Sequence, residues 1–403
     1  MASTAAASLS SSVVAAAAAS GKPPAKLMVI DTDAGADDAL AIILAVSALA
    51  RGQTSLPLHA ITTTHGNVPV DYVDINIRKI LYYLSRVDRK LAQCVNGIEL
   101  FSGAQRPLVP VAGWKRNETW PGHGSDGLGD VRDPAIPLPP PSRDSSSGSE
   151  STSGSHFEFS TEHAASALVR LARQSPGEIR LVAVGPLTNV ALSLGLDPSF
   201  LHNLHSLVIM GGTTASIGNV TPAAEFNFHC DPEAAHVVLE AGAALDAPEK
   251  VMLVPWEPCV ATSLSWQQFD SIFPKDADAD KLSVAHFIKR FIGLYEMQSR
   301  TGGDSAGDEN ATSESVSGMD HRFAPCDAYA VAVAMWPDEI IDHAKADCLV
   351  KLAAYVELQG RTRGGCFFDW YRGSSRSPLN VQLVKKMNAD SFYEKLKGAL
   401  ADQ

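Results

Sequence analysis

Four aspartates fall within eight residues near the start of the chain: Asp31, Asp33, Asp37 and Asp38. The segment that follows, residues 39–45, is too apolar to solvate them. Like charges a few ångströms apart raise one another's pKa, and a hard divalent cation with oxygen ligands removes that penalty. The alternative is that acids simply favour the first turn of a helix, which would explain one aspartate but not four. The spacing therefore predicts a divalent-metal site.

The elements around this cluster follow an alternating pattern. Helical patterns at 39–50 and 162–173 alternate with short β-rich runs, which are residues 27–30, 58–62, 179–184, 204–210 and 251–254. Such alternation is typical of βαβ units and a mainly parallel sheet. Each run ends in polar or glycine-rich sequence, and ligands of open α/β sheets lie beyond the carboxyl ends of the strands. We therefore predict an α/β fold with an open, mainly parallel, Rossmann-like sheet flanked by helices, in a single domain.

The bulk composition excludes several classes of protein. The chain has 403 residues, 45% of them hydrophobic, and a net charge of −12. This charge argues against a nucleic-acid partner, because a phosphate-binding surface needs clustered basic residues. No window reaches the roughly 18 apolar residues of a membrane span, so no membrane partner is expected. The six cysteines form no Cys-x-x-Cys pair, which argues against zinc and favours a reducing, cytoplasmic location.

Three segments differ in composition from the rest. Residues 1–25 are rich in Ala and Ser and are predicted to be a disordered leader, with organelle targeting as an open alternative. Segments 139–156 and 301–318 are rich in Ser, Gly and acidic residues and are predicted to be mobile insertions. Because strand-like or helical patterns lie on both sides of each, we assign residues 26–400 to one domain.

The segment from Asp31 to Asp38 resembles the amino-terminal fingerprint of the inosine-uridine-preferring nucleoside hydrolase family. The resemblance continues, in order, through residues 60–67, 184–189, 208–212, 218–227, 231–235 and 325–327. It implies the nucleoside hydrolase fold and hydrolysis of the N-glycosidic bond of purine or pyrimidine ribonucleosides, or of both. The products would be ribose and a free base, as in purine and pyrimidine salvage. The family also implies a homodimer or a homotetramer.

The resemblance assigns the metal and the base that activates water. It implies that Ca²⁺ is held by Asp33, Asp38, Asp327 and the backbone carbonyl of Val184. Asp33 would then be the general base, because it can contact both the metal and the attacking water. This chemistry resembles that of glycosidases, with a metal in place of one carboxylate.

The same resemblance assigns a ribose pocket. Its implied members are Asp37, Asn67 and Asn227 at the 2′- and 3′-hydroxyls, Asn219 and Glu225 at the 5′-hydroxyl, and Met210 beneath the sugar, with Phe226 and Tyr295 as further substrate-binding residues. A turn role is the alternative for Asn67 and Asn219, since each adjoins a glycine and Asn tolerates the left-handed region. Simple core packing is an equally good interpretation of Met210.

The base-binding side departs from the family pattern. His123, in a glycine-rich stretch, matches a catalytic histidine near the base, but the family's second histidine is replaced by Cys326. A thiol is a poor match to a purine or pyrimidine leaving group. His123, Tyr295 and His321 are therefore the candidate proton donors.

Two further positions near the site were considered. Trp256 is a candidate for stacking on the base, with core packing as the alternative. Ala34 stands where the family usually has proline, and we expect Gly35 to permit the tight turn there.

Two other functions compete with the hydrolase. A HAD-like phosphatase also places Asp-x-Asp after a strand, with the first aspartate as nucleophile and Mg²⁺ as the metal. It leaves the Asp37–Asp38 pair and the 225–227 segment without a role. A non-catalytic nucleoside or ribose binder is the other alternative, in which Cys326 marks the loss of chemistry.

Overall fold

The computed structural model describes residues 25–110, 121–131, 157–273, 282–301, 322–371 and 378–400, with only the backbone of 121 and 298–301. The leader up to residue 24, the segment 139–156 and residues 302–318 lie outside the described residues, so the predictions made for them stay predictions.

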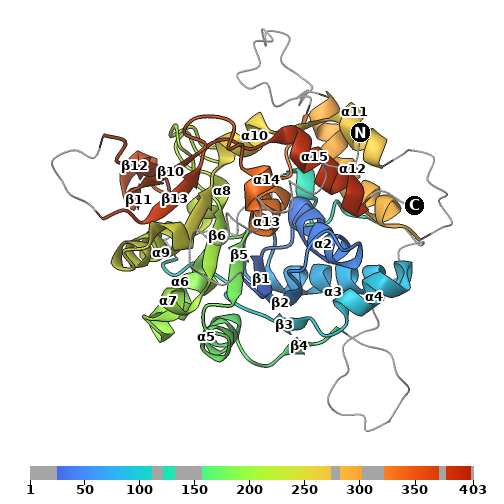
Figure 1. Ribbon diagram of the computed structural model, residues 1–403, viewed down its shortest axis with the longest axis horizontal. Coiled ribbons are helices and arrows are strands. Elements are labelled where there is room, and N and C mark those ends of the chain that lie inside the picture. The colour runs from blue at the N-terminus through green and yellow to red at the C-terminus, as the bar shows by residue number, and fades with distance from the viewer. Residues whose placement is uncertain are drawn as a thin grey trace, which may run out of the picture.

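A nine-stranded sheet forms the centre of the molecule (Figure 1). In spatial order its strands are β10 (Leu349–Leu352), β13 (Val381–Val384), β7 (Val251–Val254), β6 (Ser206–Met210), β5 (Ile179–Ala183), β1 (Leu27–Thr32), β2 (Leu58–Thr63), β3 (Glu99–Phe101) and β4 (Phe159–Ser160). Neighbouring strands are parallel except for the antiparallel pair β10–β13 at one edge. The predicted open, mainly parallel sheet is confirmed.

The direction of the chain reverses between β1 and β5. From β1 the chain moves outward through β2, β3 and β4, and then returns to β5 on the other side of β1 before continuing to β6 and β7. Connections therefore leave the two central strands toward opposite edges, which opens a crevice beyond their carboxyl ends. The cluster of four aspartates begins in β1 at this crevice.

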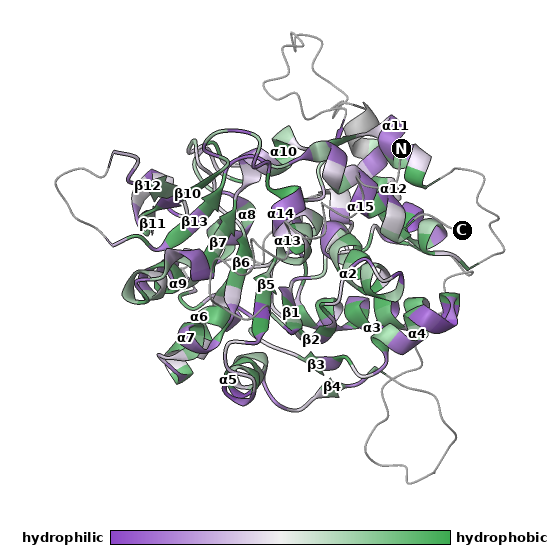
Figure 2. Cartoon of the chain, viewed as in Figure 1, coloured by the Kyte–Doolittle hydropathy of each residue, from purple (hydrophilic) through white to green (hydrophobic). Residues whose placement is uncertain are grey.

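Helices cover both faces of the sheet, as in the predicted α/β fold. One face carries α2 (Ala36–Ala50), α3 (Val70–Val87), α4 (Arg89–Val95), α11 (Trp266–Ile272), α12 (Val284–Thr301), α13 (Cys326–Met335) and α15 (Ala389–Leu400). The other carries α5 (Ala164–Gln174), α6 (Thr188–Leu196), α7 (Phe200–Asn203) and α9 (Pro232–Ala244). The central strands are mostly hydrophobic because both of their faces are buried (Figure 2).

Shorter elements complete the described chain. They are α8 (Phe226–Cys230), α10 (Trp256–Ala261), α14 (Pro337–Ile340), the 3-10 turns η1 (Pro121–His123), η2 (Pro248–Lys250) and η3 (Gly360–Thr362), and the strand pairs β8 (Leu264–Ser265) with β9 (Arg322–Phe323) and β11 (Ala354–Val356) with β12 (Cys366–Phe368). No helix in the described part of the chain is long and apolar enough to cross a bilayer. All six cysteines are free thiols.

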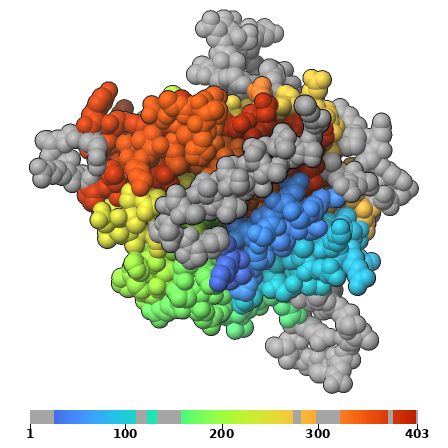
Figure 3. All heavy atoms as spheres, in the orientation of Figure 1, coloured from blue at the N-terminus to red at the C-terminus, as the bar shows by residue number. Residues whose placement is uncertain are grey.

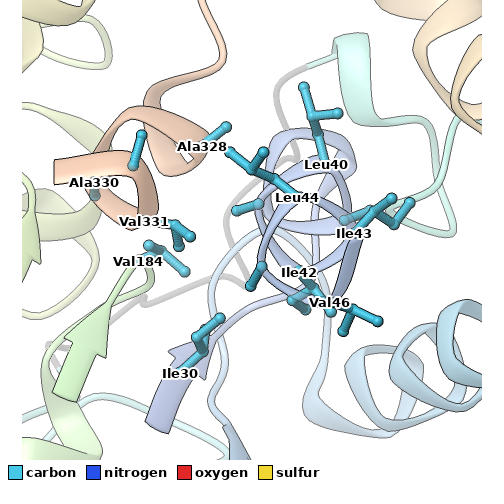
Figure 4. Close-up of a cluster of buried hydrophobic side chains, with 14 of the residues drawn as sticks. Ile30, Leu40, Ile42, Ile43, Leu44, Val46, Val184, Ala328, Ala330 and Val331 are labelled. Carbon is cyan, nitrogen blue, oxygen red and sulfur yellow. The ribbon is translucent and has the colours of Figure 1, made fainter. Parts of the chain in front are cut away.

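Helix α2 lies at the centre of the larger core. It begins at Ala36, three residues before the predicted start, because Asp37 and Asp38 occupy its first turn. Its apolar side chains pack against the sheet and α13, and Leu44 projects from α2 toward Ala328 of α13 (Figure 4). A helix that is apolar on nearly all sides is stable only when surrounded in this way.

The carboxyl-terminal part of the chain packs against α2. The Arg51 Nε just after α2 donates to the carbonyl of Ala399 in α15 at 2.9 Å, and the Trp336 indole donates to the carbonyl of Gln53 at 3.0 Å. Figure 3 shows the red carboxyl-terminal residues beside the blue amino-terminal ones. This packing holds α13, and with it Asp327, beside the start of α2.

Replacing Leu44 with alanine should test the importance of this core. Because the side chain is fully buried, Leu44→Ala should lower the free energy of unfolding by roughly 2–5 kcal/mol in a urea titration. The matched control is Leu196→Ala in α6, where the side chain is 58% exposed and the expected change is within about 0.5 kcal/mol. Equal effects of the two substitutions would contradict the packing described for α2.

Candidate active site

Polar side chains gather beyond the carboxyl ends of the central strands. Asp33 follows β1, Asn67 follows β2, Val184 follows β5 and Met210 ends β6. These strands are neighbours in the sheet, and β1 and β5 flank the point where the chain reverses direction. The convergence expected from the sequence is thus present in the fold.

Three carboxylates form a tight group at this place. Asp37 and Asp38 lie in the first turn of α2 and Asp327 in the first turn of α13, and one oxygen from each lies within 4.8 Å of the others. Asp33 is not a member of this closest group, but the charge of Asp38 acts on it, and its own charge acts on Asp327. The structure therefore brings Asp327 to the amino-terminal cluster, and it places Asp37, predicted as a ribose ligand, nearest to Asp327 and Asp38.

Asp33 is held from one side only. Its Oδ2 accepts the backbone N–H of Asn67 at 2.7 Å, whereas its buried Oδ1 has no hydrogen-bond partner among the described residues. Gly66 makes this approach possible, because a Cβ there would lie 2.0 Å from Asp33 Oδ2. An unpaired buried carboxylate oxygen is costly, and this one lies at the crevice, where a ligand or cation would satisfy it.

Asp38 is fixed by several donors. Its Oδ1 accepts the Thr32 hydroxyl at 2.5 Å, and its Oδ2 accepts the Gly35 N–H at 2.8 Å and the Asn67 amide at 3.3 Å. Asn67 thus contacts Asp33 through its backbone and Asp38 through its side chain. Donors of this kind favour the ionised carboxylate and set its orientation.

The electrostatics of the group favour a bound cation. Burial raises the pKa of both Asp33 and Asp327 well above the usual range. The next cause is the charge of a neighbouring aspartate, which is Asp38 for Asp33 and Asp37 for Asp327. Burial also raises the pKa of Asp37 to about 6. A hard divalent cation with oxygen ligands offsets both causes. The all-oxygen donor set and the unpaired Asp33 Oδ1 fit such an ion. The Val184 carbonyl accepts the Asn227 amide at 3.0 Å, and the next residue, Gly185, lies close to Asp33, since a Cβ there would be 3.0 Å from Asp33 Oδ1.

His123 faces the acidic group from the η1 turn. Its Nδ1 accepts the backbone N–H of Ala36 at 3.0 Å, so the neutral ring carries its proton on Nε2. Nε2 lies 3.9 Å from Asp37 Oδ1. Burial lowers the pKa of His123 to about 4, partly opposed by the charge of Asp38. The ring is therefore neutral at pH 7 and presents an N–H donor toward the carboxylates.

Asn76 positions the His123 loop, and the sequence analysis missed it. From α3, its side-chain amide donates to the carbonyls of Asp126 at 2.7 Å and Ala34 at 3.3 Å. It thereby joins the loop that carries His123 to the turn that carries Asp33. Nothing in the sequence near Asn76 marks it, because it lies within an ordinary amphipathic helix.

The predicted ribose residues lie on the β6 side of the crevice. Asn227 is buried, and its amide donates to the carbonyls of Val184 and Met210 at 3.0 and 3.1 Å. Asn227 therefore links the ends of β5 and β6. The buried Met210 side chain contacts Asn227, with 3.4 Å between the sulfur and the amide nitrogen, while Phe226 is half-buried.

Glu225 and Asn219 have structural contacts of their own. The Glu225 carboxylate caps α8 by accepting the N–H groups of Asn227 at 2.9 Å, Phe228 at 3.3 Å and Gly212 at 2.8 Å. Asn219 is exposed, and its side-chain oxygen accepts the N–H of Phe226 at 2.9 Å. Asn219 thus connects its loop to the start of α8, but its backbone does not have the left-handed conformation of the turn role.

The candidate proton donors differ in their surroundings. The Cys326 thiol is buried and donates to the Ala324 carbonyl at 3.5 Å, and its pKa is raised well above the usual range, first by the interaction with the Cys259 thiol and then by burial. Burial also raises the pKa of Tyr295, whose ring packs edge-on against Trp266 and Phe323. Both groups therefore stay protonated at neutral pH.

Trp256 and His321 are the two remaining residues that were predicted for the base side of the site. Trp256 begins α10 and is half-buried beside the core. His321 lies outside the described residues.

The turn after Asp33 differs from the expectation. Ala34, rather than Gly35, has the left-handed conformation, with φ of 44°, while Gly35 is extended at φ −75°. Gly35 is needed for another reason, because a Cβ there would lie 2.5 Å from the Asn67 amide and 3.0 Å from the His123 ring. The glycine permits close approach of two side chains.

The phosphatase hypothesis requires an accessible Asp31. That residue is fully buried, and its Oδ1 accepts the Thr62 hydroxyl at 2.5 Å and the Asn189 amide at 2.8 Å. Burial does not distinguish Asp31 from the equally buried Asp33, but Asp31 lies within β1 and its Oδ1 is occupied by these two donors, so the geometry gives no support to a nucleophilic role.

Comparisons with known proteins agree with this geometry. The model of the family described as inosine-uridine preferring nucleoside hydrolase matches residues 28–394. Uridine nucleosidase 1 of Arabidopsis thaliana is 36% identical over 216 residues, which cover 54% of this chain and 54% of that protein. A pyrimidine-specific ribonucleoside hydrolase of Enterobacter is 33% identical over 232 residues, covering 56% of this chain and 62% of that protein. The matches thus span little more than half of these curated relatives.

A solved structure extends the similarity over the whole fold. An inosine-guanosine nucleoside hydrolase superposes with a TM-score of 0.70 and 29% identity, covering 93% of this chain and 98% of that one. The names of these proteins refer to different bases.

The buried Glu225 predicts a pH dependence of stability. Burial raises its pKa from 4.5 to about 7, although three N–H groups partly oppose the shift. The folded protein therefore binds this proton more tightly than the unfolded chain does. The resulting stabilisation is complete below pH 4.5 and is lost as the pH rises toward 7, with a total of roughly 3 kcal/mol.

Urea titrations between pH 4.5 and 7.5 should show this effect. In Glu225→Gln the decline of the unfolding free energy with pH should be shallower than in the wild type, whatever the absolute stability of the variant. Glu240→Gln, on the exposed side of α9, is the control for removal of a surface carboxylate. Parallel declines in wild type and Glu225→Gln would show that Glu225 does not carry the effect.

Proposed function

The chain belongs to the inosine-uridine preferring nucleoside hydrolase family, and we propose that it hydrolyses the N-glycosidic bond of ribonucleosides in a Ca²⁺-dependent reaction. The observation that carries the proposal is the group of carboxylates from α2 and α13, with the unpaired Asp33 Oδ1 beside it in the turn after β1. The products are ribose and the free base, whether purine or pyrimidine. The support is the family match together with this oxygen-rich crevice.

The proposed cofactor is Ca²⁺, held by Asp33, Asp38, Asp327 and the Val184 carbonyl, with Asp37 next to them. Calcium accepts six to eight oxygen ligands in flexible geometry, which suits carboxylates contributed by three elements. When bound, it supplies positive charge that offsets the buried carboxylates and attracts the oxygen atoms of a sugar diol.

Asp33 is proposed to activate the attacking water. Its Oδ2 is fixed by the Asn67 N–H, which leaves Oδ1 to accept a proton from water. The water oxygen forms a bond to C1′ as the bond from C1′ to the base nitrogen breaks, and the electrons of that bond leave with the base. The ribose passes through an oxocarbenium-like state, as in glycosidases.

His123 is proposed to stabilise the departing base. Its ring presents Nε2–H because Nδ1 already accepts the Ala36 N–H. This N–H can donate a hydrogen bond to the base as negative charge develops there. The proton that completes the free base comes from solvent or from a neighbouring hydroxyl or thiol, with Tyr295 and Cys326 both protonated near neutral pH.

Ribose recognition is assigned to the β2 and β6 sides of the crevice. Asp37 of the carboxylate group and Asn67, whose amide donates to Asp38, form one side, while Asn227, Glu225 and Met210 lie together on the other. A site with paired donors and acceptors discriminates strongly against sugars that lack a hydroxyl. We therefore expect ribonucleosides to be preferred over 2′-deoxyribonucleosides.

Removing one carboxylate should separate metal binding from fold stability. In chelator, Asp327→Asn should unfold at a higher temperature than the wild type, because it removes one of several repelling buried charges. With excess Ca²⁺ the order should reverse, since the wild type gains about 2.7 kcal/mol at one hundred times the dissociation constant. Asp71→Asn, at an exposed position on α3, should behave as wild type in both buffers. An unfolding temperature of the wild type that does not change when Ca²⁺ is added would contradict the proposed cofactor.

A panel of inosine, uridine, adenosine and cytidine, scored for released ribose, tests the reaction. Wild type with Ca²⁺ should release ribose from at least one of them, and chelator should stop the release. Asp33→Asn should reduce kcat by several orders of magnitude while remaining folded, because it removes the general base. Binding of nucleosides without release of any base would favour the non-catalytic binder instead.

A further inference from the structure

Three buried residues without a role in the proposed reaction meet behind the crevice. The His65 Nε2 lies 3.0 Å from the Thr188 hydroxyl oxygen, and that hydroxyl lies 2.6 Å from Asp231 Oδ2. The three come from distant parts of the chain: the loop after β2, the first residue of α6 and the residue before α9. Each belongs to one of the sequence blocks described above, yet none was given a function.

The direction of the hydrogen bonds follows from the donors that meet Asp231. Its carboxylate also accepts the N–H groups of Leu108 at 2.9 Å and Ala234 at 3.0 Å, so it is surrounded by donors. The single hydroxyl proton of Thr188 is therefore directed at Asp231. The His65 ring must then donate its Nε2–H to Thr188, because the hydroxyl has no second proton to give. Burial lowers the pKa of His65 to about 4, which agrees with a neutral ring.

The hydrogen bonds that run from Asp231 through Thr188 to His65 end at the loop that holds Asp33. The residue after His65 is Gly66, which packs against the Asp33 carboxylate, and the next is Asn67, whose N–H donates to Asp33 Oδ2 at 2.7 Å. The backbone N–H of His65 also donates to the Ala104 carbonyl at 2.9 Å. The ring and the backbone of His65 therefore fix the loop from two directions.

We propose that Asp231, Thr188 and His65 form a hydrogen-bonded chain that positions the 64–67 loop and thereby aims the Asp33 carboxylate at the attacking water. The three are positioning residues, since none touches the reacting atoms. The proposal rests on the proposed hydrolase function. Loss of supporting hydrogen bonds of this kind typically reduces activity by 10- to 100-fold.

Two substitutions at Thr188 separate positioning from packing. Thr188→Val has the same shape but no hydroxyl, whereas Thr188→Ser keeps the hydroxyl and loses a methyl group. Positioning predicts a kcat close to wild type for Thr188→Ser and a 10- to 100-fold lower kcat for Thr188→Val. A purely packing role predicts the opposite order, and that result would overturn the proposal. Ser193→Ala, in the same helix, is the control, because it removes a buried hydroxyl that does not belong to the hydrogen-bonded chain.

A second pair of substitutions, at His65, tests the other end of the hydrogen-bonded chain if Thr188→Val fails to fold. His65→Gln retains an N–H donor at a similar reach, and His65→Leu retains apolar bulk only. Recovery of kcat in His65→Gln relative to His65→Leu is expected. Equal loss in both would contradict the donor role of the ring.

Nitrogen-15 NMR of histidine-labelled protein tests the hydrogen-bonded chain without an activity measurement. The wild type should show an Nε2–H proton that exchanges slowly with water, is absent from His65→Gln and exchanges faster in Thr188→Val. A His65 ring protonated on Nδ1 would overturn the proposal. If the wild type hydrolyses no ribonucleoside, the proposed function fails, while this spectrum still decides whether the hydrogen-bonded chain exists.

Discussion

The repulsion among four buried carboxylates is the constraint on which the rest of the site depends. Burial is the largest cause that raises the pKa of all four, which are Asp33, Asp37, Asp38 and Asp327. For all of them except Asp37, the second cause is the charge of another aspartate in the group. Such a group persists only where the fold supplies many donors and room for a cation. The position beyond β1 and β5 supplies such donors, because the helix that begins there presents backbone N–H groups and the Thr32 and Asn67 side chains add to them.

Close approach is the second requirement of this arrangement. Gly35 and Gly66 each stand where a Cβ would collide with Asn67, His123 or Asp33. Their role is to let neighbouring side chains touch, since neither adopts a left-handed backbone. The strained residue is instead Ala34, whose N–H and carbonyl are held by Thr32 and Asn76. Hydrogen bonds on both sides explain how a residue with a Cβ keeps this conformation.

The sequence was sufficient for the fold class and for the region of the site. The strand-like runs became β1, β2, β5, β6 and β7, because a buried parallel strand is marked by a short apolar run that ends in polar residues. Local patterns carry no information about contacts between distant segments, however. For this reason the placement of Asp37 beside Asp327, the bridge made by Asn76 and the meeting of His65 with Thr188 emerged only from the fold. The left-handed Ala34 was missed because glycine usually takes such positions.

The position of Asp327 on α13 also sets an order of events during synthesis. Asp33, Asp37 and Asp38 leave the ribosome early, whereas the helix that completes their group emerges only after β7 and α12. Until then the early segment has neither its last carboxylate nor the apolar surface of α13 that covers α2. Until α13 emerges, the face of α2 that α13 covers therefore stays exposed in the nascent chain, and chaperones that shield growing chains would find an apolar surface there.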